Sequence, residues 1–212
     1  MTHVRGNVLR TDRTDVIQDS EIQEAIENAR RIKDPYFQLR AVAVLSLLRI
    51  SGKRRGEVAI IPLDNFSVKP EYLEVKFILE KKRTKTKLNK ISTKQFPLDD
   101  PLTQNVIEYL NYLEKLTPKP KFWLPTGKAV FGTYIINPNK ALTGRQVFNI
   151  VRNNSEKIWP HLNRETVGAD VVAQDDSINA VFKVQQTLDL ENFETAFRYV
   201  KRFSKQIIKR AQ

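Results

Sequence analysis

The sequence predicts a mainly α-helical domain with one small antiparallel β-sheet, an α+β fold. Apolar residues recur at helical spacing through most of the chain, whereas residues 72–79 alternate with period two. A chain of 212 residues, of which 41% are hydrophobic and 28% charged, has the size and composition of one globular domain. We therefore expect one domain over residues 20–212, preceded by a flexible polar arm over residues 1–19.

Two helices are expected to begin the domain. Ser20, with Gln23 three positions later, matches a capping box and starts the first helix. Its apolar face comprises Ile22, Ala25, Ile26, Ala29 and Ile32. The second helix, residues 36–50, is apolar nearly all round, which indicates a position in the middle of the core. Ser51-Gly52 ends it, and a short helix follows before Pro62.

A β-hairpin is expected next. Residues 72–79 place alternate apolar side chains on one face, and residues 91–98 form the return strand. Residues 81–94, which cover the expected turn and the first part of the return strand, include several basic residues and no acidic one. The sequence therefore predicts a hairpin whose turn region is strongly positive.

Helices are expected to make up most of the remainder. Asp100-Pro101 begins one that closes at the loop with Pro118 and Pro120, and residues 122–131 are expected to form a further loop. Three more helices are expected: one that Thr143 caps, one from Pro160 to about Gln174, and one that begins near Ser177. The last helix covers residues 193–208.

Charge points to a polyanionic partner. The chain has 36 Lys and Arg against 24 Asp and Glu, a net charge of +12, and a second basic run, residues 198–210, also lacks acidic residues. Such a balance favours nucleic acid, because neutralising phosphates releases condensed counterions. The alternative is a solvated basic surface without a ligand. An RNA-binding module is disfavoured, since no RNP-like aromatic strand is visible.

Other classes of protein find little support. The chain has no cysteine, no Walker loop and no carboxylate cluster, so we expect no disulfide, metal or other cofactor. Its longest apolar stretch, residues 41–48, is too short to span a bilayer, and the amino terminus has no secretion signal. A cytoplasmic, DNA-associated location follows.

Four patterns could carry chemistry. Ser51-Gly52-Lys53-Arg54-Arg55-Gly56-Glu57 mounts an arginine behind a core helix, where it could clamp a phosphate or merely lie in solvent. His161 and Arg164 share one side of a helix, and the alternative is a cap and a surface arginine. A lysine of the hairpin could donate a proton or only contact phosphates. Tyr199 lies in an apolar stripe, so it could equally be a core aromatic.

The order of these patterns resembles the catalytic domain of the tyrosine recombinases, the phage-type integrases and Xer-like recombinases, over about Ser20 to Lys205. The family's Thr-Gly-x-Arg-x-x-Glu matches residues 51–57, and its His-x-x-Arg box matches residues 161–164. Ala141 to Val147 resembles the family's helix before the His-x-x-Arg box. Leu188 to Tyr199 resembles the family's last motif, which ends on the nucleophilic tyrosine.

The resemblance implies the residue roles. The catalytic residues would be Arg54, Lys82, His161, Arg164 and the nucleophile Tyr199, with Glu57 in support. Lys82 lies where the strand enters the turn, while Lys81 and Lys85 remain alternatives. The residues expected to contact DNA are Lys81, Arg83, Lys85, Lys87 and Arg145. The chain departs from the family at Leu190, where His or Trp is usual, and at Glu165, where His or Lys is common.

The resemblance also implies an activity. Tyr199 would attack double-stranded DNA and form a 3′-phosphotyrosine link without metal or ATP, as in the integration or recombination of a mobile genetic element. Relatives act as tetramers on paired sites, so we expect a homo-tetramer on DNA and a monomer or weak oligomer in solution. No core-binding domain is seen before Ser20, which predicts weak, salt-sensitive DNA binding. The alternatives are a type IB topoisomerase-like activity and a DNA-binding protein that has lost catalysis.

Overall fold

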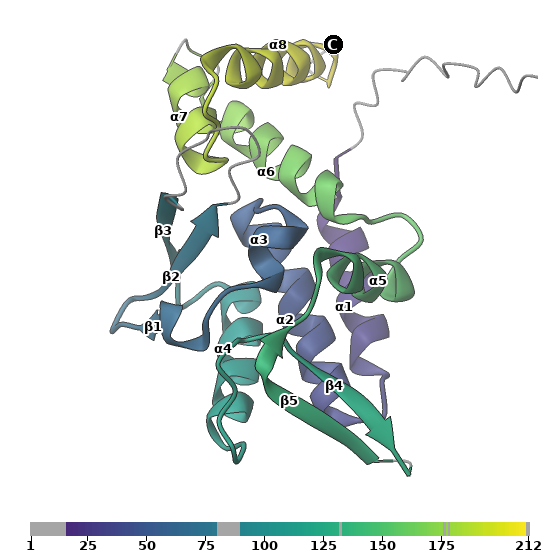
Figure 1. The fold of residues 1–212 in the computed structure, drawn as a ribbon. Coiled ribbons are helices and arrows are strands. Elements are labelled where there is room, and N and C mark those ends of the chain that lie inside the picture. Colours follow the sequence, from purple (N-terminus) through teal and green to yellow (C-terminus); the bar gives the residue numbers. More distant parts are fainter. Residues whose placement is uncertain (1–15, 80–89, 132, 176, 178, 211–212) are drawn as a thin grey trace, which may run out of the picture.

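The computed structural model describes residues 16–79, 90–131, 133–175, 177 and 179–210, with side chains described as far as residue 204. Figure 1 shows helix α2 (Pro35–Ser51) running through the middle of the molecule, with a three-stranded antiparallel sheet at the left and a two-stranded one at the bottom. Helices α6, α7 and α8 lie together at the end of the molecule away from the β4–β5 hairpin (Figure 1). The α+β class expected from the sequence is confirmed.

The first two helices pack on each other and begin the core. Helix α1 (Asp19–Arg30) is capped at Gln18 rather than at Ser20, because the carboxylate of Glu21 accepts the backbone N–H of Gln18 at 3.0 Å. Helix α2 (Pro35–Ser51) is capped by Asp34, whose side chain accepts the N–H of Phe37 at 3.1 Å. Helix α2 packs against α1, α4, α5 and α6, so the central position expected from its composition is confirmed.

The boundary expected at residue 19 needs a correction. Residues 1–15 lie outside the described part of the chain, but Ile17 is only 3% exposed. Its backbone N–H donates to the Thr166 hydroxyl at 2.9 Å. Ile17 therefore packs on the domain, whereas Gln18 and Asp19 are exposed.

The segment after α2 turns at once into the sheet. Helix α3 (Arg55–Ala59) and the 3₁₀ turn η1 (Leu63–Asn65) lead to strand β1 (Phe66–Val68). Strands β2 (Tyr72–Leu79) and β3 (Lys90–Pro97) form the predicted hairpin, with Leu79 paired to Lys90 at its end. The sheet order is β1-β2-β3, all antiparallel.

A second hairpin follows α4 (Pro101–Glu114), and the sequence did not indicate it. Strands β4 (Pro125–Val130) and β5 (Thr133–Ala141) pair antiparallel where a loop was expected over residues 122–131. Pro125 and Gly127 disfavour a strand locally, and the hairpin has few buried positions, so its apolar alternation is weak. The expectation of one sheet was therefore wrong; the described residues form two.

The remaining helices agree with the sequence to within a few residues. They are α5 (Gly144–Asn154), α6 (Pro160–Gln174), α7 (Asn179–Thr187) and α8 (Phe193–Arg210). Thr143 caps α5 as expected, since its hydroxyl accepts the N–H of Gln146 at 3.3 Å. Helices α7 and α8 pack on each other and on α6.

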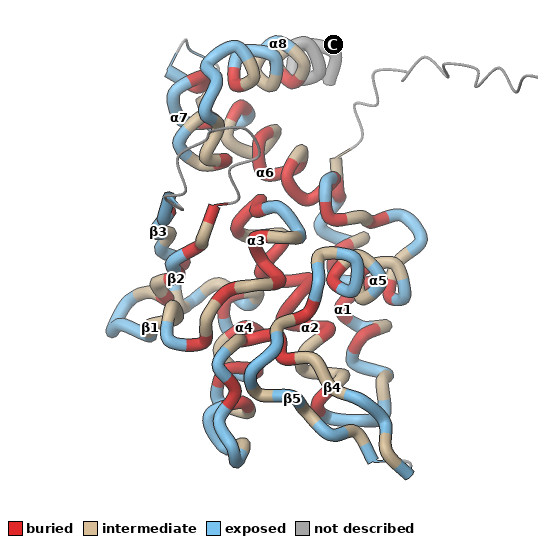
Figure 2. Tube along the Cα trace, viewed as in Figure 1, coloured by how far each residue is buried: buried red, intermediate tan, exposed pale blue. Residues whose placement is uncertain are grey.

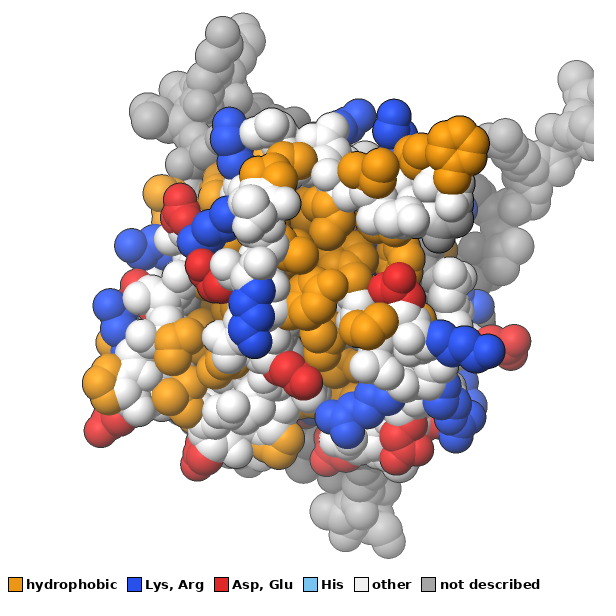
Figure 3. Space-filling model, turned by 90° about the horizontal axis from the view of Figure 1, so that it is seen from below, with side chains coloured by type: hydrophobic (Ala, Val, Ile, Leu, Met, Phe, Trp, Pro, Cys, Tyr) orange, Lys and Arg blue, Asp and Glu red, His pale blue; other side chains and the backbone are white. Residues whose placement is uncertain are grey.

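The buried hydrophobic residues form two clusters. Figure 2 colours the buried residues red along the chain. The large cluster surrounds α2, and the small cluster joins α6, α7 and α8. Seen from below, hydrophobic side chains also gather in a hollow at the centre of one face, with charged side chains around it (Figure 3). Among the described residues, no helix is both long enough and apolar enough to cross a membrane.

Candidate functional site

Arg54 is held at the junction of α2 and α3. Gly52 ends α2 with a φ of 59°, and a Cβ there would lie 2.9 Å from the Leu188 side chain, so the turn needs a glycine. Arg54 follows as the cap of α3. The buried carboxylate of Glu57 accepts both the backbone N–H and the guanidinium of Arg54, each at 2.9 Å. The Arg54 side chain is still 47% exposed, so its other donors face outward.

Arg164 lies inside the protein on α6, with only 3% of its surface exposed. Its guanidinium donates to the backbone carbonyl of Gly52 at 2.8 Å and to that of Leu188. Burial, and next the positive charge of Arg54, lower the pKa of Arg164. Arg164 therefore joins the turn that carries Arg54 to the turn that leads into α8.

Tyr199 packs on the same helix as Arg164. Gly168, one helical turn after Arg164, lies under the Tyr199 ring, and a Cβ on Gly168 would come within 2.6 Å of Tyr199 Cδ1. Burial raises the pKa of Tyr199, and the neighbouring Arg164 guanidinium opposes that shift. The phenol is thus half-buried beside a cation.

His161 occupies a more exposed position than Arg164. Its side chain is 65% exposed, and its Nε2 lies 3.3 Å from the Glu165 carboxylate. Glu165 also accepts from Arg202 of α8 at 3.3 Å. Although burial raises the pKa of Glu165, its contacts with His161 and Arg202 outweigh this and lower it. The acidic residue that departs from the family pattern is thus the residue that His161 contacts.

Three of the expected site residues come together, and the others divide into two groups. Arg164 connects the other two residues. It donates to the carbonyl of Gly52, two positions before Arg54, and lies one helical turn before Gly168, on which the Tyr199 ring packs. The charges of Arg54 and Tyr199 both affect the pKa of Arg164. His161 lies at the edge of this site and contacts Glu165 rather than Arg164. The basic residues of the hairpin lie outside the described part of the chain: Lys81, Lys82, Arg83, Lys85 and Lys87.

Arg145 lies on the exposed surface beside the site. Its guanidinium stacks over the ring of Phe148 at 5.0 Å from the centroid, and that of Arg55 lies 5.4 Å from the same ring. Both arginines are exposed. Gly144 of α5 also lies against Gly56 of α3, so α3 and α5 together present cations next to Arg54.

The sequence did not indicate two residues at the floor of the site. Lys53 is fully buried and forms an ion pair with Asp189, which lies between α7 and α8. In the run Lys53-Arg54-Arg55, three cations in succession suggest a solvated turn, and no local signal marks Lys53 as buried. Its burial depends on a partner far away in the chain.

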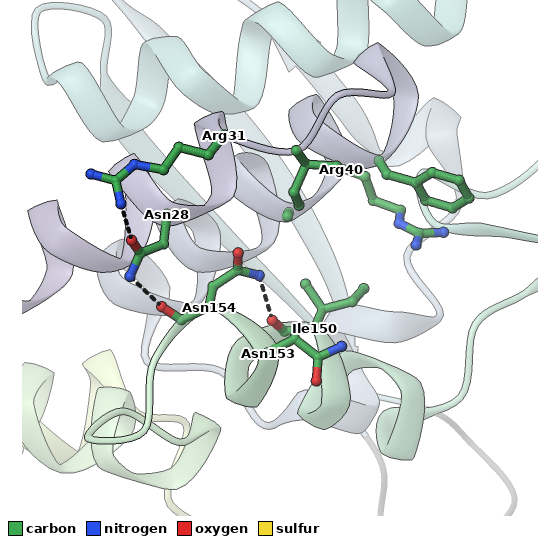
Figure 4. Close-up of a pocket in the computed structure, with 9 residues that line it drawn as sticks. Asn28, Arg31, Arg40, Ile150, Asn153 and Asn154 are labelled. Atoms are coloured by element: carbon green, nitrogen blue, oxygen red, sulfur yellow. Dashed lines mark hydrogen bonds between the residues drawn. The ribbon is translucent and has the colours of Figure 1, made fainter.

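A separate pocket of about 460 Å³ lies between α1, α2 and α5 (Figure 4). Arg31 donates to Asn28, and Asn28 donates to the backbone of Asn154, so hydrogen bonds connect the polar residues that line the pocket (Figure 4). None of the residues that the sequence indicated as functional lines this pocket. We therefore place the candidate site at Arg54, Arg164 and Tyr199 instead.

Comparison with known proteins supports the fold through structure alone. No protein-family model and no curated protein matches the sequence. The XerH site-specific recombinase bound to its difH substrate, in a pre-cleavage complex, superposes with a TM-score of 0.60 at 15% identity, over 92% of this chain and 52% of that one. XerA recombinase superposes with a TM-score of 0.62 at 14% identity, over 93% of this chain and 64% of that one. A lambda integrase dimer bound to a COC′ core site superposes with a TM-score of 0.54 at 11% identity, over 88% of this chain and 59% of that one.

These matches identify the fold as that of tyrosine recombinase catalytic domains. The chain spans about half to two thirds of the length of those structures. At such low identities, similarity concerns the path of the chain and not the chemistry of the site.

Proposed function

We propose that this chain is the catalytic domain of a site-specific tyrosine recombinase or integrase that acts on double-stranded DNA. Tyr199 attacks a phosphodiester, its oxygen becomes bonded to the 3′ phosphate, and the 5′ oxygen leaves as a hydroxyl. Attack by a second 5′-hydroxyl reverses the step, releases Tyr199 and joins the strands. The observation that carries the proposal is that Arg164 lies near both the Arg54 turn and the Tyr199 ring, which come from distant segments of the chain, on this fold.

The two arginines suit a phosphate in different ways. Arg54 keeps part of its guanidinium exposed while Glu57 fixes its direction. Arg164 uses one N–H on each of two carbonyls and has further donors to offer. A pentavalent phosphate gains negative charge as Tyr199 attacks, and donors already fixed in place stabilise it by several kcal/mol in comparable sites.

The nucleophile needs its proton removed during attack. Burial raises the pKa of Tyr199, so the neutral phenol is the resting form at neutral pH. A phosphate next to Arg164 would draw the phenol oxygen toward the same cation, and His161 would accept the proton. Lys82, outside the described residues, is the residue we propose to protonate the leaving 5′ oxygen.

The surface beside the site fits the DNA backbone. Arg55 and Arg145 add exposed positive charge next to Arg54, and the chain carries a net charge of +12. Phosphate contacts of this kind weaken steeply with salt. Assembly as a homo-tetramer on paired sites, and association with a mobile genetic element, complete the proposal.

A nicked suicide substrate tests the proposal. Loss of a short 5′ fragment during cleavage traps the covalent adduct, which is seen as a protein band that carries labelled DNA. We expect the adduct with the wild-type chain and with Tyr112→Phe on α4, and none with Tyr199→Phe. An adduct of undiminished yield in Tyr199→Phe would contradict the assignment. Relaxation of supercoiled plasmid without site preference would instead indicate topoisomerase-like activity.

A second candidate is a DNA-binding protein on the same fold without catalysis. Two observations favour it: Leu190 is apolar where the family has a donor, and the Glu165 carboxylate lies 3.3 Å from His161 Nε2. The same assay separates the candidates. DNA binding by the wild-type chain without any adduct would support the second one.

A further inference from the structure

Lys53 is a charged residue in an unusual position. It is among the largest fully buried side chains of the described residues, with an exposure of 0%. Its ammonium donates to the Ser92 hydroxyl of β3 at 2.9 Å and to the Asp189 carboxylate, and it lies 4.7 Å from the centre of the Phe77 ring of β2. Burying such a charge without a partner is costly, so its place depends on these contacts.

Asp189 is held from several sides in the turn between α7 and α8. Its backbone adopts a φ of 47°, a conformation that a non-glycine residue rarely takes and that Asp and Asn tolerate best. Besides Lys53, its carboxylate accepts the Ser92 hydroxyl at 2.8 Å and lies 3.6 Å from the Lys94 ammonium. Lys94 also donates to the backbone of Gln186 at 2.6 Å.

These contacts link the same two turns that Arg164 links. Arg164 binds the carbonyls of Gly52 and Leu188, and the residue after each of these is a member of the Lys53–Asp189 pair. The turn at Asp189 leads directly into α8, which carries Tyr199. The Arg54 turn, β3 and the start of the Tyr199 segment are therefore joined at one buried point.

We propose that Lys53 and Asp189 are positioning residues, whose buried ion pair fixes the turn before α8 against the Arg54 turn and so sets where Tyr199 lies relative to Arg54 and Arg164. The effect on Tyr199 chemistry rests on the proposed function; the anchoring of the turn does not. An apolar pair could fill this space with little loss of stability. A charged pair with directed hydrogen bonds does more, because it defines the angle as well as the distance between the two turns.

The pair should respond to pH. The charged groups near the Lys53 ammonium are Asp189, Lys94 on β3 and Glu57 on α3. Burial lowers the pKa of Lys53 to about 8, although Asp189 opposes that shift. As the pH rises through this value, Lys53 loses its proton and the attraction to Asp189 weakens. Positioning of Tyr199 should weaken with it.

The test compares Lys53→Met, Asp189→Asn and the double variant in the full chain. Asn tolerates the left-handed backbone, so Asp189→Asn removes the charge without a conformational penalty. Lys183→Met is the control, because it breaks the ion pair of Lys183 with Asp175 at 2.7 Å, which does not touch the Arg54 turn. We measure the single-turnover rate of adduct formation on the nicked substrate and, separately, the affinity for intact duplex DNA.

We expect each single variant to form the adduct about 10- to 100-fold more slowly, the range that a displacement of about 1 Å can produce. DNA affinity should stay within about twofold, because phosphate contacts are unchanged. The double variant should recover thermal stability but not the rate. The wild-type rate should fall above a pH of about 8, and that fall should be absent in Lys53→Met.

Unchanged rates in both single variants, or a double variant that recovers rate together with stability, would overturn the positioning role. A separate measurement keeps the result distinct from a failure of the proposed function. Amide hydrogen exchange of residues 188–192 needs no DNA, and it should accelerate in Asp189→Asn but not in Lys183→Met. If the wild-type chain forms no adduct, unchanged exchange in Asp189→Asn overturns the inference, and faster exchange upholds the anchoring.

Discussion

The two apolar clusters differ in how completely they are enclosed. Around α2, residues such as Leu45, Leu47 and Trp123 are fully buried among neighbours from several helices. In the cluster of α6, α7 and α8, the interior is small, and Phe182, Phe193 and Phe197 remain 52%, 43% and 45% exposed. Arg54 is thus mounted on a deep core, whereas Tyr199 is carried by a thin layer.

This difference shows where the geometry of the site is decided. The thin layer of α6, α7 and α8 has few packing contacts to fix its position. Polar contacts between this layer and the core around α2 are therefore more important for its position. Arg164 and the Lys53–Asp189 pair are those links. Four changes should separate the behaviour of the two regions.

Removing one buried leucine from each cluster should have the largest effect on stability. Leu47→Ala and Leu188→Ala delete the same atoms from sites of 0% exposure. We expect Leu47→Ala to lower the free energy of unfolding by about 2–5 kcal/mol, with Leu188→Ala at the lower end because the thin layer can relax into the space. Denaturant titration measures the loss. Amide exchange should accelerate throughout the protein for Leu47→Ala and chiefly in α7 and α8 for Leu188→Ala; the reverse pattern would refute the contrast.

Gly168→Ala should act on Tyr199 with little effect on folding. The added methyl group would lie 2.6 Å from the Tyr199 ring, so the ring must move. Crowding of the ring costs about 1–3 kcal/mol, and the helix preference for Ala over Gly offsets about 1 kcal/mol of this, so the variant should remain folded. We expect adduct formation to slow by about 100-fold. Gln174→Ala, at an exposed position of the same helix, serves as control, and equal rates in the two variants would show that Tyr199 tolerates the displacement.

The pH dependence of stability should report Lys53. Its pKa is about 8 in the folded protein and about 10.5 in the unfolded chain. Between these values the unfolded chain holds a proton that the folded protein has released, so the free energy of unfolding rises with pH. Denaturation from pH 7 to about 9.5 should show this rise in the wild-type chain and not in Lys53→Met. At higher pH, buried tyrosines with raised pKa values oppose the trend.

Glu165→Gln should have the smallest effect. It removes a negative charge beside Tyr199 and releases His161 from its ion pair. We expect affinity for duplex DNA to rise about two- to fivefold, the size of one exposed charge interaction, and less at high salt. Glu114→Gln, which breaks the exposed pair with Lys119 at the far end of α4, should change affinity by less. Equal gains in both variants would mean that only net charge matters.

Much of the secondary structure could be predicted from local patterns. The apolar period of α2, the alternation in β2 and the cap at Thr143 each depend on residues a few positions apart. The β4–β5 hairpin escaped prediction because its strands bury little and contain Pro125 and Gly127. The start of α1 was misplaced because the sequence offers two overlapping capping boxes, and Gln18 with Glu21, rather than Ser20 with Gln23, forms the cap.

The candidate site divides in the same way. The spacing of the motifs pointed to Arg54, Arg164 and Tyr199, and Arg164 lies near both the Arg54 turn and the Tyr199 ring. The shared side of α6 expected for His161 and Arg164 was less informative, because one side chain is 65% exposed and the other is buried. Helical spacing predicts which side of the helix a side chain lies on, but it does not predict whether other segments bury that side chain.

Most of the helices, the β2–β3 hairpin, the basic character of the chain and the residues that could act on a phosphate could be predicted from the sequence alone. Only the tertiary structure decided that, of two neighbouring cations, Lys53 is fully buried and Arg54 half exposed. The partner that makes this burial tolerable, Asp189, lies 136 positions away. Desolvation of a charge depends on everything that packs around it, and no local pattern contains that information.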